Sequence, residues 1–177
     1  MEKAIFINKE RMITQEARYT DYSETTLLPG AAESLTLLKN AGFKLILTAN
    51  QAPRRMDIFE ISRQLQKFNT DIDGFYYCPH TGAECECHKP KAGLLFEAAE
   101  KENLDLKNSW LIGDTLDDIE AGNRAGCNTI LLANGNETQW HVTPIRQPEF
   151  LSPNFEYAAG AVILKSIYQM IKQQQSG

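Results

Sequence analysis

Five short apolar runs alternate with amphipathic segments of helical length along this chain. Each run has the length of one strand and is apolar on both faces, so the strands belong in a parallel sheet that helices cover on both sides. The predicted strands span 3–7, 44–48, 74–77, 109–112 and 129–132. The predicted helices are one that opens at 28–30 and others at 54–68, 91–102, 117–125 and about 158–174; residues 8–27 and 133–153 are predicted to be irregular. The sequence therefore predicts an α/β fold with five or six mostly parallel strands.

Length and composition narrow the classes of protein. The 177 residues suit one domain over 1–177, because no linker or internal repeat divides them. The net charge is −5 and no basic run appears, which argues against nucleic-acid binding, including a nucleic-acid-binding zinc module. No apolar stretch approaches the roughly 18 residues of a membrane span, and the N-terminus lacks the apolar core of a signal peptide. We therefore expect a cytoplasmic protein with no membrane partner, in which clustered cysteines bind metal rather than form disulfides.

A loop over 78–88 carries two close pairs of metal-ligand residues. The pairs are Cys78-x-His80 and Cys85-x-Cys87, separated by a short polar segment. Three thiolates and one imidazole make a closed tetrahedral set, which is typical of structural zinc; a catalytic zinc would keep an open position for water. The competing interpretation is three buried cysteines and an unrelated histidine. His88 adjoins the set and is a possible competing ligand.

Ligands of parallel α/β sheets bind beyond the carboxyl ends of the strands. In this chain the positions to inspect are Asn8, the segment 49–51, the surroundings of Lys89, and Asp114.

Several motifs in order resemble one family. They are Leu28-Pro29-Gly30, Asn50-Gln51, Cys78-Pro79-His80, the segment 85–93 that includes His88-Lys89-Pro90-Lys91, and the segment 113–122 that begins Gly113-Asp114-Thr115. Over about residues 3–135, the chain resembles the haloacid dehalogenase (HAD) superfamily, and within it the zinc-containing branch of histidinol-phosphate and D-glycero-D-manno-heptose 1,7-bisphosphate phosphatases. The resemblance implies a Rossmann-like fold. No large insertion follows the first or second motif, so little or no cap domain is expected.

The resemblance also implies a chemistry. In the family, an aspartate after the first strand attacks phosphorus, a second aspartate transfers protons, and a hydroxyl and a lysine stabilise the phosphoryl oxygens beside Mg²⁺. Here Asn8 holds the nucleophile position and Glu10 the acid/base position. Lys89 is kept, and Asp114 is kept as a Mg²⁺ ligand, although Asn8 weakens the Mg²⁺ site because a carboxamide carries no charge.

The phosphate-binding or substrate-binding positions that the resemblance implies are partly changed as well. Ala49 stands where the phosphate-binding hydroxyl is expected, His88 replaces an arginine, and Thr115 replaces the lysine of heptose-type enzymes. Asn50 and Gln51 are kept.

We therefore interpret the chain as a zinc-stabilised, catalytically impaired pseudo-phosphatase that binds a small phosphorylated ligand or a protein partner. The alternative is an active Mg²⁺-dependent phosphomonoesterase for a small sugar phosphate or a histidinol-phosphate-like substrate. Two further points concern the charged residues near the site. Lys89 either contacts phosphate or pairs with Asp114. Asp117 and Asp118 are read as first-turn helix residues rather than metal ligands.

Overall fold

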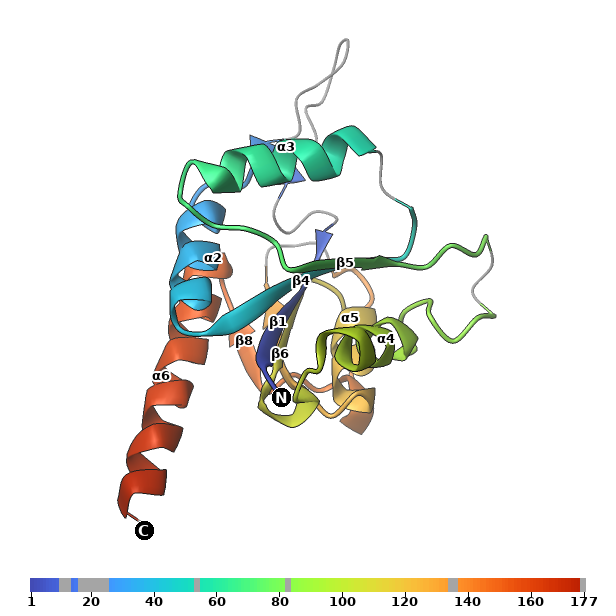
Figure 1. Cartoon of the computed structure of the whole chain (residues 1–177). Helices are drawn as coiled ribbons and strands as arrows, with labels where there is room; N and C mark the ends of the chain where they lie inside the picture. The colour runs from blue at the N-terminus through green and yellow to red at the C-terminus, as the bar shows by residue number, and fades with distance from the viewer. Residues whose placement is uncertain (10–13, 16–25, 53–54, 82–83, 134–136, 176–177) are drawn as a thin grey trace.

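One sheet of parallel strands organises the chain (Figure 1). Its strand order is β5-β4-β1-β6-β7-β8. The strands are β1 (Lys3–Asn8), β4 (Phe43–Ala49), β5 (Gly74–Tyr77), β6 (Trp110–Gly113), β7 (Asn128–Leu132) and β8 (Phe150–Ser152). The structure is a computed structural model that describes residues 1–9, 14–15, 26–52, 55–81, 84–133 and 137–175.

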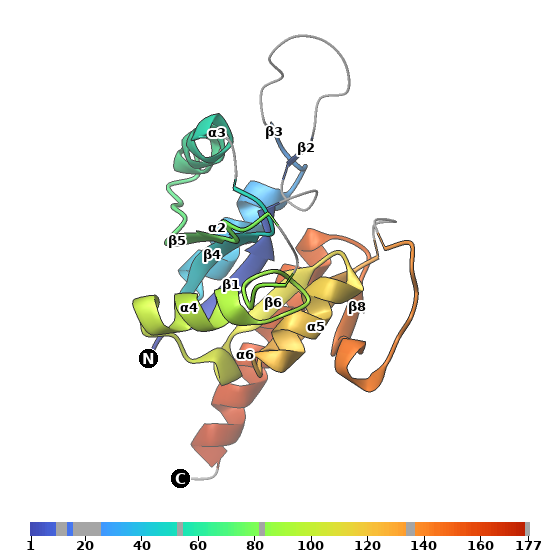
Figure 2. The same ribbon diagram turned by 90° about the vertical axis from the view of Figure 1, so that its right-hand side faces the viewer.

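Helices cover both faces of this sheet (Figure 2). The helices α2 (Ala31–Asn40), α3 (Arg55–Gln66) and α6 (Phe155–Gln175) share one apolar core with the strands. On the opposite face, α4 (Gly93–Glu102) lies in a second core, and α5 (Leu116–Arg124) packs Leu116 and Ile119 against Leu131 in a smaller cluster. The alternation along β1 separates the two cores, because Ile5 and Ile7 face the first and Phe6 faces the second. The sheet is thus buried on both faces, which explains the unbroken apolar runs.

The predicted α/β class and its five strands are confirmed, each end within one residue of its expected place. The prediction of an irregular segment over 133–153 is wrong. This segment contains the 3-10 helix η2 (Pro144–Arg146) and the edge strand β8, which pairs parallel with β7. Residues 8–27 contain a short antiparallel pair, β2 (Thr14–Gln15) and β3 (Thr26–Leu27).

The central position of β1 determines where a site can form. β1 pairs with β4 on one side and β6 on the other, with Asn8 opposite Thr48 and Ile7 opposite Ile112. The carboxyl ends of these three strands therefore meet at one edge. Within the described ranges, no helix combines the length and the apolar character that crossing a membrane requires.

Candidate functional site

The four predicted zinc ligands converge in the loop between β5 and α4. Their ligand atoms all lie within 4.8 Å of one another. The Sγ atom of Cys78 lies 3.2 Å from that of Cys85 and 3.0 Å from that of Cys87, and His80 Nδ1 lies 3.1 Å from Cys87 Sγ. Donors this close surround a single point, as a tetrahedral zinc site requires. The residues therefore fit structural zinc.

The pKa values of two thiols of this cluster are shifted in opposite directions. Burial opposes the ionisation of Cys85, but hydrogen bonds with Cys78 and Cys87 lower the pKa of Cys85 to about 6. Burial and the same neighbouring thiols raise the pKa of Cys87 to about 12. Thiolates, not thiols, bind zinc, so metal binding must release the proton that Cys87 otherwise keeps.

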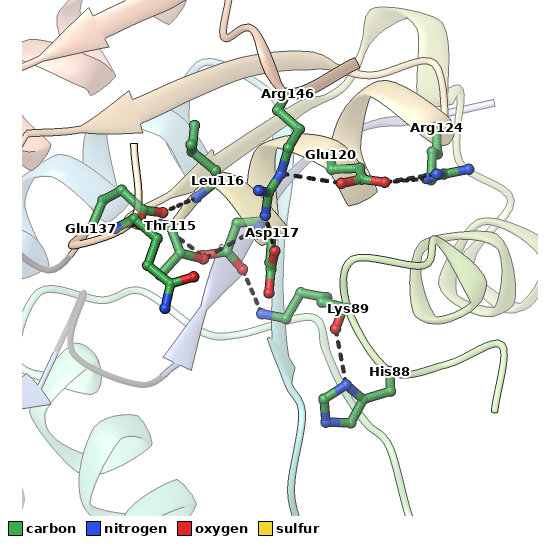
Figure 3. A network of polar contacts seen from close by, with 11 residues as sticks. His88, Lys89, Thr115, Leu116, Asp117, Glu120, Arg124, Glu137 and Arg146 are labelled. Atoms are coloured by element: carbon green, nitrogen blue, oxygen red, sulfur yellow. Dashed lines mark hydrogen bonds and ion pairs between the residues drawn. The ribbon is translucent and has the colours of Figure 1, made fainter. Parts of the chain in front are cut away.

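His88 takes no part in the cluster. Its Nδ1 lies 2.9 Å from the backbone carbonyl oxygen of Lys89, the contact that Figure 3 draws for this ring. Among the residues that the structure describes, the cluster that could hold a metal consists of the four predicted ligands and does not include His88.

A cavity of about 410 Å³ lies beyond the carboxyl ends of the strands, where the sequence predicted a site. Five of the predicted residues line it, and they come from the ends of β1, β4 and β6 and from the segment after the zinc loop: Asn8, Asn50, Lys89, Asp114 and Thr115. The fold thus brings together residues that are more than 100 positions apart in the sequence.

Three predicted ligand-binding residues lie outside this lining. Ala49 is buried, and its carbonyl oxygen accepts a hydrogen bond from the backbone N–H of Cys78 at 3.1 Å. Gln51 is exposed, and His88 is oriented as described above. Asn50 has a defined structural role, because its Oδ1 accepts a hydrogen bond from the backbone N–H of Lys89 at 2.9 Å. This contact connects the end of β4 to the segment that carries the lysine.

Lys89 pairs with Asp118 and not with Asp114, the pairing that the sequence left open as the alternative to phosphate contact. Lys89 Nζ lies 2.6 Å from Asp118 Oδ1, and both side chains are almost completely buried. The other oxygen of Asp118 accepts hydrogen bonds from Thr115 Oγ1 at 2.9 Å, from the Asp114 N–H at 3.3 Å and from Asn8 Nδ2 at 3.4 Å. Asp118 therefore connects Lys89, Thr115, Asn8 and the backbone of Asp114 at the edge of the sheet.

Asp118 can do this because it begins a helix. It is the third residue of α5 and forms a reciprocal capping box with Thr115, which confirms its reading as a first-turn residue. Gly113 makes room for it, since a Cβ at Gly113 would lie 2.3 Å from Asp118 Cβ. Burial opposes ionisation of this carboxyl, but the Lys89 ammonium and the hydrogen bonds from Thr115 and the Asp114 N–H together hold the pKa of Asp118 below its ordinary value.

The oxygen groups near Asn8 and Asp114 fit a Mg²⁺ ion only in part. Mg²⁺ prefers oxygen ligands, and Asp114 contributes a buried carboxylate after β6 while Asn8 contributes a neutral carboxamide oxygen at the end of β1. The Asp118 carboxylate is already paired with Lys89. The next residue, Lys9, forms an ion pair with Asp57, with 2.9 Å between Lys9 Nζ and Asp57 Oδ2. Glu10, the predicted acid/base residue, lies outside the described residues.

Part of the cavity lining comes from a segment that the sequence did not indicate. Glu137 and Arg146, which lie after β7, both line the cavity. Glu137 Oε2 accepts a hydrogen bond from the Leu116 N–H at 2.6 Å, and Arg146 forms ion pairs with Asp117 and Glu120 (Figure 3). No local motif marks these residues, because their role depends on how the chain returns over α5.

The chain is similar to several known proteins. A family model described as HAD-hydrolase-like matches residues 86–158. The D-glycero-beta-D-manno-heptose-1,7-bisphosphate 7-phosphatase of Pasteurella multocida is 31% identical over 154 residues, covering 76% of this chain and 84% of the relative. The D-glycero-alpha-D-manno-heptose-1,7-bisphosphate 7-phosphatase of Campylobacter jejuni is 32% identical over 143 residues, covering 75% and 83%. These names favour the active alternative over the impaired interpretation.

A solved structure supports the same fold. The D,D-heptose 1,7-bisphosphate phosphatase of B. bronchiseptica, crystallised with magnesium and phosphate, superimposes with a TM-score of 0.78 at 21% identity and covers 92% of this chain and 99% of that one. The likeness therefore covers nearly the whole chain. With the fold, the Cys/His cluster and the similarity to the two phosphatases in place, the chain belongs to the HAD superfamily, in the zinc-containing branch of the heptose bisphosphate phosphatases.

Proposed function

We propose that this protein is a phosphomonoesterase of the HAD type that acts on a small sugar phosphate of the heptose bisphosphate class. The observation that carries the proposal is the placement of Lys89: its buried ammonium lines one cavity together with Asn8 and Asp114. The names of the relatives support the substrate class.

The reaction transfers a phosphoryl group from a sugar oxygen to water, which yields inorganic phosphate and the sugar with a free hydroxyl group at that position. Lys89 is the group that stabilises negative charge on the phosphoryl oxygens, because an ammonium in a water-poor site acts more strongly than in bulk water. Asp118 and Asn50 are positioning residues, since they hold the side chain and the backbone of Lys89.

A divalent cation belongs to this chemistry. Asp114 and Asn8 would hold Mg²⁺, which neutralises charge on the transferred phosphate and orients it when bound. Only one of these two residues is anionic, so we expect weaker Mg²⁺ binding than an aspartate at position 8 would give.

Asn8 favours a second candidate function. A neutral carboxamide is a poor nucleophile, and loss of a covalent nucleophile costs a factor on the order of 10⁴ to 10⁶ in rate. A protein with this residue would still bind a phosphorylated ligand at Lys89 while releasing phosphate slowly or not at all. Such a protein is a pseudo-phosphatase.

Phosphate release with Mg²⁺ separates the two candidates. The substrates are heptose 1,7-bisphosphate and histidinol phosphate, and the variants are Lys89→Ala, Asn8→Asp and the control Lys91→Ala, whose side chain bonds the Glu84 carbonyl on the surface. Wild-type turnover that Lys89→Ala abolishes and Lys91→Ala keeps would support the phosphomonoesterase. Turnover that appears only in Asn8→Asp would support the second candidate. No release by any of these proteins would refute the phosphomonoesterase.

A further inference from the structure

We infer that Arg146 binds a second anionic group of the ligand, so that this site selects a sugar bisphosphate over the corresponding monophosphate. The inference rests on the proposed function and names a specificity residue for it. Arg146 belongs to η2, outside every motif that carries the family resemblance.

The cavity has two cationic side chains within its described lining, and they differ in their surroundings. Lys89 is held inside by Asp118, with both side chains at most 3% exposed. The Arg146 side chain is 20% exposed and pairs with Glu120, which is 12% exposed, and with Asp117, which is 50% exposed, so the contact with Asp117 is the one open to exchange. An ion pair with a half-exposed partner is weak and exchanges readily with a ligand. Lys89 is therefore suited to the reacting phosphate, and Arg146 to a second anion near the mouth.

The guanidinium also has hydrogen-bonding capacity that the protein does not use. Arg146 Nε lies 3.2 Å from Glu120 Oε2, but it is the one buried side-chain polar atom in the described ranges without an aligned hydrogen-bond acceptor. Glu120 itself is also engaged by Arg124 at 2.7 Å. A buried donor without an acceptor is unfavourable, and a phosphate oxygen is a strong acceptor for arginine.

The backbone around Arg146 is fixed in place. Asn123 Nδ2, on α5, donates hydrogen bonds to the carbonyl oxygens of Ile145 at 2.8 Å and Gln147 at 3.0 Å, the residues on either side of Arg146. Figure 3 shows the Arg146 side chain extending to Asp117, in the same network of polar contacts that contains Lys89. Because the arginine is positioned before a ligand arrives, binding would cost little ordering entropy.

Asp117 is the built-in competitor for the same guanidinium. A ligand phosphate would take the place of the Asp117 carboxylate, because this side chain can rotate toward the solvent. Removing the charge at Asp117 should therefore strengthen bisphosphate binding, whereas removing the charge at Arg146 should weaken it. The two variants act in opposite directions at one contact.

Calorimetric binding tests the inference without requiring turnover. Heptose 1,7-bisphosphate and heptose 7-phosphate are titrated in Ca²⁺ instead of Mg²⁺ into wild type, Arg146→Gln, Arg146→Lys and Asp117→Asn. The control is Arg124→Gln, which removes an arginine from the same Glu120 but lies outside the cavity lining. We expect wild type to bind the bisphosphate about 10- to 100-fold more tightly than the monophosphate, as a charge-assisted bidentate contact provides.

Arg146→Gln should abolish this preference while leaving monophosphate affinity unchanged, Arg146→Lys should keep part of it, and Asp117→Asn should raise it. Arg124→Gln should match wild type. Equal loss of both affinities in Arg146→Gln, or no preference in wild type, would overturn the inference. Failure of the proposed function is a different result, since it appears as absent phosphate release in the preceding assay while the binding preference persists.

Discussion

Lys89 Nζ lies 2.6 Å from Asp118 Oδ1, and neither side chain exposes more than 3% of its surface. Two full charges are thereby removed from water, which costs about as much free energy as their attraction returns. We interpret the pair as a device that positions the lysine rather than as a source of net stability. Each of the predictions that follow depends on this pair or on the metal cluster beside it.

Breaking the pair from either side should destabilise the protein strongly. Lys89→Met or Asp118→Asn leaves one buried charge without its partner, and we expect each to lower the free energy of unfolding by about 3–5 kcal/mol. The double variant should lose less than the sum of the two. Urea unfolding measures all three. The control is Lys101→Ala, which breaks a surface pair at 2.6 Å with Glu97 and should cost about 0–1 kcal/mol. Additive losses in the double variant would contradict the coupling.

The same pair predicts an acid dependence. The folded-state pKa of Asp118 is lowered, whereas an unfolded aspartate has a pKa of about 3.9. Its stabilising contribution is therefore fully present above about pH 4 and is lost as the pH falls through the folded-state pKa. Wild type should lose stability below about pH 4 more steeply than Asp118→Asn, as measured by unfolding midpoints over a pH series. Parallel curves would show that Asp118 does not titrate in this way.

Zinc should be bound at about one ion per chain and should stabilise the fold. Cys85→Ala removes a ligand, and we expect it to lose the metal and several kcal/mol of stability, since structural zinc contributes on the order of 10 kcal/mol in small domains. The matched control is Cys127→Ala. Cys127 is buried, and its pKa is raised to about 12 by burial, so it stays a neutral thiol away from the cluster. Metal analysis and thermal melts measure both effects; less than about one zinc per chain in wild type would refute the site.

A methyl group added at Gly113 should displace Asp118 and so disturb the position of Lys89. Its Cβ would lie 2.3 Å from Asp118 Cβ, so Asp118 must move and its contact with Lys89 should loosen. We expect Gly113→Ala to cost about 1–3 kcal/mol and to weaken phosphate binding. Gly160→Ala is the control within α6, where a Cβ meets nothing within 4 Å and should stabilise by about 0.5–1 kcal/mol. Denaturant unfolding and phosphate titration would show the contrast; equal effects of the two changes would contradict the steric argument.

The strands of the sheet core could be predicted from the sequence because burial on both faces leaves an unbroken apolar run. The edge strand β8 could not. Its three residues include Phe150 and Leu151, both exposed, so neither length nor alternation distinguishes them from a loop. Pairing with β7 makes them a strand, and pairing depends on the rest of the fold.

The candidate site shows the same limit. Residues at strand ends, such as Asn8 and Asp114, could be found because a parallel sheet gathers them at one edge. Asp118 was read only as a helix-start residue, since a sequence shows its place in α5 but not the lysine that packs against it. Arg146 had no local signal at all. Its position depends on side-chain contacts between α5 and η2 that no spacing rule predicts.

A single residue separates Cys87 from Lys89 along the chain. The metal cluster thus acts as an anchor for the segment that delivers the lysine to the cavity, although its four ligands lie outside the lining. A genetic screen that scored only the binding of the phosphorylated ligand would rank the four metal-binding residues beside Lys89. It would then assign a direct contact to residues that act only by holding the segment of Lys89 in place. Cells short of zinc would carry a protein whose proposed phosphate site fails while every residue in that site is intact.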